Sequence, residues 1–92
     1  MRTIKFSGRF KKDYRRAKAG VLGDKVDALL AEIIEMLAND KPPPERCRDH
    51  ALAGEWKDFR DCHIRPDLVL IYRKDETSLE LARLGSHSDL GL

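Results

Sequence analysis

The chain has 92 residues, of which 41% are hydrophobic and 37% are charged, and its formal net charge at pH 7 is +2. These values exclude a disordered chain, and the length allows one domain with a modest core, so we expect a single domain over residues 1–92. The apolar stretches fall short of the ~18 residues of a membrane span, and the first residues lack the apolar segment of a signal peptide. We therefore expect a cytoplasmic protein without membrane contacts.

The charge is unevenly distributed along the chain. Residues 1–18 carry eight basic residues against one acidic residue, Asp13, whereas the rest of the chain carries ten basic and fifteen acidic residues. A segment with a net charge of +7 can form a surface that faces phosphate groups. An ordinary solvated helix face has the same composition, so both interpretations stay open at this point.

The first predicted elements are a short strand and a basic helix. Residues 2–6, "RTIKF", alternate polar and apolar side chains, which is typical of a strand. Ser7 is a candidate helix cap, and the helix is expected from about Gly8 to Lys18. Its apolar residues recur at i, i+4 and i+7 and form a narrow stripe: Phe10, Tyr14 and Ala17.

The second predicted helix has the clearest pattern. Asp24 is expected to cap it, and the prolines of "KPPPER" end it near Asn39. Its apolar residues follow the 3.6-residue period over three turns: Val26, Leu29, Leu30, Ile33, Ile34 and Leu37. A short loop that contains Gly20 and Gly23 joins the two helices, so we expect them to pair antiparallel.

The second half of the chain predicts three strands. Residues 47–54 are expected to form a loop or one helical turn, and residues 56–64, "WKDFRDCHI", can form a strand. Residues 67–73, "DLVLIYR", are typical of a strand buried on both faces, and residues 78–85, "SLELARLG", predict the last strand. The order β-α-α-β-β-β predicts an α+β fold, in which a small, mainly antiparallel sheet carries a helical hairpin on one face. The other face is expected to be partly open.

Three histidines, none expected in a helix, are the main candidates for chemistry: His50, His63 and His87. His63 and Asp67 flank the break "IRP", so in a tight hairpin their Cβ atoms would lie about 5 Å apart. A carboxylate beside an imidazole orients it and raises its pKa. A structural turn pair would have the same spacing. Strand alternation also places four residues on one face: Lys57, Phe59, Asp61 and His63.

The last strand adds a cation near these groups. Alternation puts Arg83 on the face of Leu79 and Leu81, and His87 would share that face if the strand ran straight past Gly85. A planar guanidinium near imidazoles and carboxylates suggests a phosphate site. A solvated histidine near a chain end is the plainer interpretation of His87.

No metal or other cofactor is expected. Cys47 with His50 and Cys62 with His63 supply ligand types for zinc, but their spacing matches no standard zinc pattern. Neighbouring residues on a strand point to opposite faces, so Cys62 and His63 can hardly bind one ion. Two cysteines do not make a disulfide framework either.

Two segments carry a family resemblance. Residues 48–73, "RDHALAGEWKDFRDCHIRPDLVLIYR", and residues 83–90, "RLGSHSDL", resemble the YafQ branch of the RelE/ParE toxin superfamily. The blocks DHxLxGxWxxxRDxHxxPDxxLIY and GxH are fairly specific in combination, and the likeness extends over nearly the whole chain. The resemblance implies a RelE-like microbial ribonuclease fold. It also implies a type II toxin–antitoxin toxin that acts as a ribosome-dependent endoribonuclease on mRNA.

The resemblance also implies which residues form the site. Matching positions of the superfamily are these: His50, Asp61, His63, Asp67, Arg83 and His87. Metal-free RNA cleavage needs a base for the 2′-OH proton, an acid for the 5′-oxygen and cations for the charge on phosphate. We expect His87 to be the acid and Arg83 to stabilise the transition state. The base is expected to be His50, or His63 with Asp67.

The implied partners are a DinJ- or RelB-like antitoxin, mRNA in the ribosome and ribosomal RNA, with operator DNA contacted only through the antitoxin complex. Residues expected to face RNA are Lys11, Lys12, Arg15, Arg16, Lys18, Lys57 and Arg60. Family members often end in an aromatic residue, whereas Gly91 and Leu92 end this chain, so base stacking worth about 1–3 kcal/mol is missing. Two alternatives stay open: a ParE-like non-nuclease toxin that inhibits a protein, and an inactive remnant that only binds an antitoxin.

Overall fold

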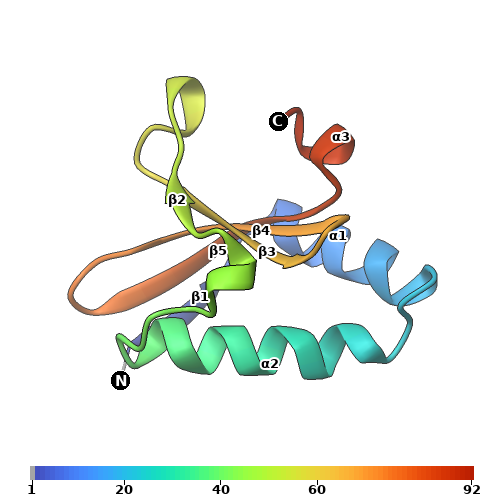
Figure 1. The fold of residues 1–92 in the computed structure, drawn as a ribbon, viewed down its shortest axis with the longest axis horizontal. Helices are drawn as coiled ribbons and strands as arrows, with labels where there is room; N and C mark the ends of the chain where they lie inside the picture. Colours follow the sequence, from blue (N-terminus) through green and yellow to red (C-terminus); the bar gives the residue numbers. More distant parts are fainter. Residues whose placement is uncertain (1) are drawn as a thin grey trace.

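The computed structural model describes residues 2–92, except for the side chain of Arg46. Five strands form one sheet in the order β1-β5-β4-β3-β2 (Figure 1). The elements are β1 (Thr3–Phe6), α1 (Gly8–Ala19), α2 (Lys25–Ala38), η1 (Glu45–Cys47), β2 (His50–Ala51), η2 (Gly54–Trp56), β3 (Arg60–Arg65), β4 (Leu68–Lys74), β5 (Ser78–Gly85) and α3 (His87–Leu90). Only β1 and β5 pair in parallel among these strands. The predicted α+β class and mainly antiparallel sheet are confirmed.

The larger core lies between the sheet and the helices α1 and α2. The helix residues buried there are Phe10, Val26, Leu30, Ile33, Leu37 and Ala38. They pack against inward-facing residues of three strands: Ile64, Leu68, Leu70, Tyr72, Leu79, Leu81 and Leu84. Burying each large apolar side chain contributes about 1.5–3 kcal/mol, so this layer supplies most of the stability. Over residues 2–92, no helix is both long and apolar enough to span a membrane.

The two expected helix caps have different outcomes. Ser7 Oγ accepts a hydrogen bond from the Phe10 amide at 3.0 Å, as predicted for the start of α1. Asp24 is the N-cap residue of α2, as predicted, but its side chain makes no capping hydrogen bond. The Asp24 Oδ1 lies 3.2 Å from the Lys18 Nζ instead.

The second face of the sheet carries a smaller apolar cluster. It consists of Val69, Ile71, Ala82 and Leu90, with Leu52, Trp56 and Phe59 packed against them. The predicted start of the strand 56–64 is wrong, since Trp56 lies in η2 and β3 begins only at Arg60. The 3-10 turn folds the Trp56 ring edge-on against Phe59, with 5.1 Å between the ring centroids. This packing covers part of the face and leaves the rest open.

The remaining corrections concern short elements. Residues 47–54 were expected as a loop or a helical turn, but they include the two-residue strand β2 beside β3. His87 was expected outside helices, but it is the first residue of α3. Ser86 and Asp89 form a reciprocal capping box there, which is enough to stabilise a single turn.

Candidate active site

Strand register places four of the six predicted site residues in two neighbouring rows on the open face of the sheet. One row runs from His50 through Asp61 and Ile71 to Arg83, and the next pairs His63 with Val69. Directly opposite residues of paired strands share a face. The predicted common face of Asp61 and His63 is therefore confirmed.

Arg83 reaches this face because of a bulge in β5. Tyr72 pairs with Leu81 and Ile71 with Arg83, so Ala82 is an extra residue in the strand. The bulge reverses the alternation after Leu81. The expectation that Arg83 shares the face of Leu81 is thus wrong, whereas its place on the same face as Asp61 follows from the pairing.

His63 and His87 form a hydrogen-bonded imidazole pair. Their Nε2 atoms lie 2.9 Å apart, and the His63 Nδ1 lies 3.1 Å from the Cys47 carbonyl oxygen. A carbonyl can only accept, so the His63 Nδ1 carries a proton and, in the neutral ring, its Nε2 is an acceptor. The proton between the two rings therefore belongs to the His87 Nε2. This geometry makes His87 the donor of the pair.

His50 stands on the other side of His63, with 6.3 Å between the ring centroids. Its Nδ1 lies 2.8 Å from the Arg48 carbonyl oxygen and 2.9 Å from the Asp61 Oδ1. The His50 Nδ1–H can align with only one of these two acceptors, and its hydrogen bond goes to the Arg48 carbonyl oxygen. Among the described residues, the Asp61 Oδ1 is then buried without an aligned donor.

Asp61 is the buried acid of the site, with only 2% of its surface exposed. Burial raises the pKa of its carboxyl above the ordinary 3.8, and the imidazoles of His50, His63 and His87 oppose that rise. Perturbed acids with specific charged neighbours cluster at functional sites. Asp61 combines this perturbation with direct proximity to His50.

Asp67 does not lie where it was expected. His63 pairs with Val69 and Arg65 with Leu68, so Asp67 belongs to the exposed turn between β3 and β4. The prediction that His63 and Asp67 face one another is wrong, because the hairpin turns at Pro66 and Asp67, so Asp67 is a turn residue and His63 lies opposite Val69. Asp67 lines a hollow with Arg16 on the side of α1 instead. Its membership of the active site stays a prediction.

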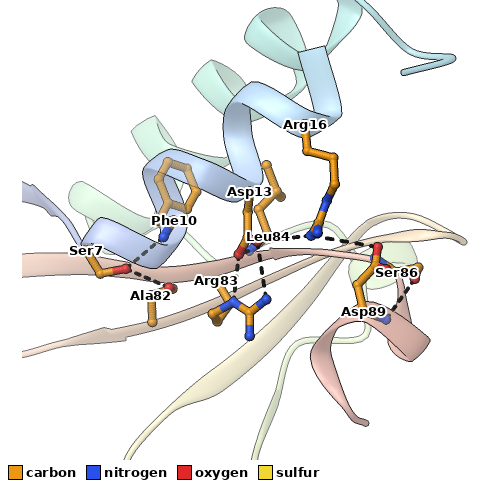
Figure 2. A network of polar contacts seen from close by, with 9 residues as sticks. All are labelled: Ser7, Phe10, Asp13, Arg16, Ala82, Arg83, Leu84, Ser86 and Asp89. Carbon is orange, nitrogen blue, oxygen red and sulfur yellow. Dashed lines mark hydrogen bonds and ion pairs between the residues drawn. The ribbon is translucent and has the colours of Figure 1, made fainter. Parts of the chain in front are cut away.

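Arg83 is half-buried and bound by an acid from α1. Its Nε donates to the Asp13 Oδ2 at 2.7 Å, and its Nη2 donates to the Asp13 Oδ1 at 3.2 Å (Figure 2). The Asp13 carboxylate raises the pKa of the guanidinium, which therefore stays charged. Sequence reasoning missed Asp13, because a single acid in a basic helix gives no sign of being buried.

A cavity of about 740 Å³ opens beside the imidazole pair. His63 and His87 form part of its wall, together with the guanidinium-bearing residues Arg48 and Arg65. Its apolar lining comes from Leu29, Ile64 and Pro66. Two guanidiniums next to imidazoles suit phosphate groups. Arg48 and Arg65 were also missed, although both stand within two residues of a predicted histidine.

The residues expected to face RNA divide into two groups. Exposed residues are Lys11, Lys12, Arg15, Arg16 and Lys57. Lys18 is held by Asp24 and Asp27, and Arg60 lies 2.6 Å from the Asp49 carboxylate. Lys11, Lys12, Arg15 and Lys57 present their charge to solvent, whereas Lys18, Arg60 and also the exposed Arg16 hold ion pairs with acids of the chain.

Ligand sets for metal are absent from the part of the chain that the structure describes. Within it, no three or more His, Cys, Asp or Glu side chains are grouped so that they could hold an ion. Cys47 and Cys62 are both buried as free thiols, and burial raises the pKa of Cys62.

Comparisons with known proteins agree on one family. The family described as "Bacterial toxin of type II toxin-antitoxin system, YafQ" matches residues 2–91. The mRNA interferase toxin YafQ of Escherichia coli strain K12 is 37% identical over 90 residues, which cover 97% of this chain and 95% of that protein.

Solved structures of relatives share the fold. A copper-bound mutant toxin from Helicobacter pylori has a TM-score of 0.87 and 40% identity, over 98% of this chain and 99% of that one. The Escherichia coli DinJ–YafQ complex contains a chain with a TM-score of 0.83 and 35% identity, over 98% of both chains. Since the family match spans residues 2–91, the chain belongs to the YafQ family of bacterial toxins of type II toxin–antitoxin systems.

Proposed function

We propose that this toxin is a ribosome-dependent endoribonuclease that cleaves mRNA in the cytoplasm without a metal ion. The observation that carries the proposal is the imidazole pair of His63 and His87, with 2.9 Å between the Nε2 atoms. Asp61, His63 and Arg83 face the same side of the sheet. The Escherichia coli relative named as an mRNA interferase supports the same activity.

The reaction moves one proton at each end of the scissile phosphate. The 2′-oxygen forms a bond to phosphorus while its proton passes to a base, and the bond to the 5′-oxygen breaks as an acid protonates that oxygen. The products are a 2′,3′-cyclic phosphate and a 5′-hydroxyl. Acid and base groups each contribute roughly 10²–10⁴-fold to such a step, and histidine titrates near neutral pH.

His50 and His87 are the proposed proton carriers. Because the His50 Nδ1–H points to the Arg48 carbonyl, its Nε2 is free of a proton and can act as the base. Asp61, 2.9 Å behind the ring, would stabilise the imidazolium that forms. His87 is the proposed acid: as an imidazolium it would give its Nε2 proton to the 5′-oxygen, and His63, 2.9 Å from that nitrogen, would orient the ring.

Arg83 is the proposed cation for the transition state. Asp13 occupies its Nε and one Nη2 position, so the Nη1 edge of the fork remains for the phosphate oxygens. Preorganised donors aimed at developing charge are usually the largest contribution to such catalysis. Arg48 and Arg65 would hold a phosphate of the flanking nucleotide in the neighbouring cavity.

The proposed partners follow from charge and from the relatives. The exposed basic residues of α1 would face ribosomal RNA, which is bound mainly through phosphate charge. A DinJ-like antitoxin is the proposed inhibitor, by analogy with the Escherichia coli DinJ–YafQ complex. Contact with operator DNA would occur only through that antitoxin complex.

The test is induction of the toxin in bacteria, with mapping of mRNA 5′ ends. We expect growth arrest with new 5′-hydroxyl ends inside open reading frames, and we expect purified toxin, freed of bound metal by dialysis against EDTA beforehand, to cut mRNA on translating ribosomes. The variant His87→Ala should produce neither. Growth arrest without new ends, or full toxicity of His87→Ala, would refute the nuclease mechanism.

A further inference from the structure

The Asp13 carboxylate gathers four donors in the protein interior. Asp13 is 5% exposed, although it is the single acid of the basic N-terminal segment. Besides the two bonds from Arg83, it accepts from the Arg16 Nη2 at 3.0 Å and from the Leu84 amide at 3.0 Å (Figure 2). A carboxylate with this many partners is fully hydrogen-bonded, which offsets the cost of its burial.

Asp13 lies where the edge of the sheet lacks a strand, because β1 is shorter than β5. β1 ends at Phe6 and pairs with β5 only as far as Leu81, so the last residues of β5 lack a strand partner on that side. α1 takes the place of the strand, since the Ser7 Oγ donates to the Ala82 carbonyl at 2.7 Å and Asp13 accepts from the Leu84 amide. The helix is thereby fixed along the segment that carries Arg83.

Asp13 orients Arg83 without cancelling the charge around it. Two parallel bonds from one carboxylate fix the plane of a guanidinium, whereas one bond would let it rotate. The Arg83 side chain is 15% exposed. Arg16 shares the same carboxylate, so the three groups together keep a charge of +1.

The same network reaches the helix that carries His87. The Arg16 Nη2 lies 4.0 Å from the Asp89 Oδ2, and Asp89 forms the capping box of α3 with Ser86 (Figure 2). α3 begins at His87. One basic helix is therefore linked to both the cation and the acid of the site.

We infer that Asp13 is a positioning residue for RNA cleavage, which holds Arg83 in the orientation that meets the scissile phosphate. The inference rests on the proposed nuclease function. It predicts that removal of the Asp13 charge lowers kcat more than it changes KM, because Arg83 still reaches the site but is misplaced. Misplacement of about 1 Å can cost 10²-fold in rate.

The experiment is a double-mutant cycle on kcat with Asp13→Asn and Arg83→Ala. We expect Asp13→Asn to lower kcat on ribosome-bound mRNA by about 10–100-fold with little change in KM. In the Arg83→Ala background, the same substitution should cost nothing further, because its effect passes through Arg83. Equal losses in both backgrounds, with native thermal melts, would overturn the inference.

The control is Asp40→Asn, which removes another carboxylate that pairs with two cations, Arg2 and Lys74, on another part of the molecule. It should leave kcat unchanged. A readout independent of cleavage is the NMR signal of the Arg83 Nε–H in the whole toxin. It should be protected from exchange in the native chain and exposed in Asp13→Asn.

The two readouts separate the two proposals. An unchanged Arg83 Nε–H signal in Asp13→Asn overturns the positioning role even if the toxin cleaves mRNA. Absence of cleavage by the native toxin overturns the proposed function, whereas the NMR signal still decides whether Asp13 orients Arg83.

Discussion

Asp61 is a residue whose buried charge lowers the stability of the fold but serves the proposed reaction. It is almost fully buried, its Oδ1 has no aligned donor among residues 2–92, and burial raises its pKa. An ionised carboxylate in such a place weakens the fold, but it stabilises an imidazolium formed beside it. The position is therefore typical of an active-site residue that reduces stability in favour of activity.

The variant Asp61→Asn tests this conflict. Removal of the unpaired charge should raise the free energy of unfolding at pH 7 by about 1–2 kcal/mol and lower cleavage at least tenfold. Because the pKa of Asp61 is raised in the folded state, native stability should fall as the pH rises above 3.8 and through the folded pKa.

Denaturant unfolding between pH 3.5 and 7 measures the effect, and this fall should be smaller in Asp61→Asn. The exposed acid Asp58 supplies the control, since Asp58→Asn should change neither stability nor cleavage. A variant Asp61→Asn that is less stable than the native chain at pH 7 would contradict the account.

The residues of the site were only partly predictable. The family resemblance predicted that His50, His63 and His87 belong to one site, and their rings lie next to one another. The prediction that His63 faces Asp67 failed because the hairpin turns at Pro66 and Asp67, and no local pattern fixes which residues form the turn. Asp13 was missed for a similar reason, since three of its four donors come from a strand about 70 residues away.

Among the elements, α1 has the double role of a core helix and a partner for the edge of β5. Phe10 fills the core, whereas Ser7 and Asp13 bond to the backbone of β5. An edge strand left open would expose unpaired backbone groups. α1 therefore stabilises the sheet where β1 stops and fixes the strand that carries Arg83.

The variant Ser7→Ala should loosen this attachment. It removes the cap of the Phe10 amide and the bond to the Ala82 carbonyl, so we expect a loss of about 1–2 kcal/mol in unfolding free energy. Cleavage should fall as well, because α1 holds Arg83 through Asp13.

Chemical denaturation and cleavage assays give the two readouts. Ser7→Thr keeps the hydroxyl and serves as the matched variant, with most of both properties retained. Equal stability of Ser7→Ala and the native chain would show that the cap and the edge bond contribute nothing.

The elements with strong periodicity were predictable, and the short ones were not. α1, α2 and the last two strands follow helical or strand patterns over at least six residues, and the structure confirms them. β2 and α3 have two and four residues, too few for a period. Pairing with β3 and the Ser86–Asp89 capping box decide these elements.

At the scale of the whole molecule, the main core and the proposed site lie on opposite faces of the sheet. The helical face of the sheet buries the main core, and the open face carries the imidazoles. The exposed basic residues gather on α1, in the segment with a net charge of +7. Such an arrangement suits a partner rich in phosphate. A binding experiment decides whether the basic segment contacts phosphate groups or is an ordinary solvated helix face.

The triple variant Lys11→Gln, Lys12→Gln, Arg15→Gln tests this binding. All three side chains are exposed, so we expect an unchanged melting temperature. Affinity for ribosomes should fall, and the slope of log K against log salt should decrease by about 2–3, since each cation releases about one counterion.

Sedimentation of toxin with ribosomes at 50–200 mM salt gives this slope. The double variant Lys25→Gln, Lys41→Gln neutralises exposed lysines outside the segment and should have a smaller effect on it. Equal slopes for the triple variant and the native toxin would favour the plain solvated face.

The central claim is that His87 protonates the 5′-oxygen leaving group, and a substrate with sulfur at that position tests it most directly. A 5′-thiolate leaves without protonation, so general-acid catalysis becomes unnecessary. On ordinary mRNA, His87→Ala should cleave about 10²–10⁴-fold more slowly than the native toxin in single-turnover experiments on ribosomes. On the 5′-thio mRNA, we expect its rate to come within about tenfold of the native rate, whereas His50→Ala should stay slow. An equal defect of His87→Ala on both substrates, or rescue of His50→Ala instead, would contradict the account.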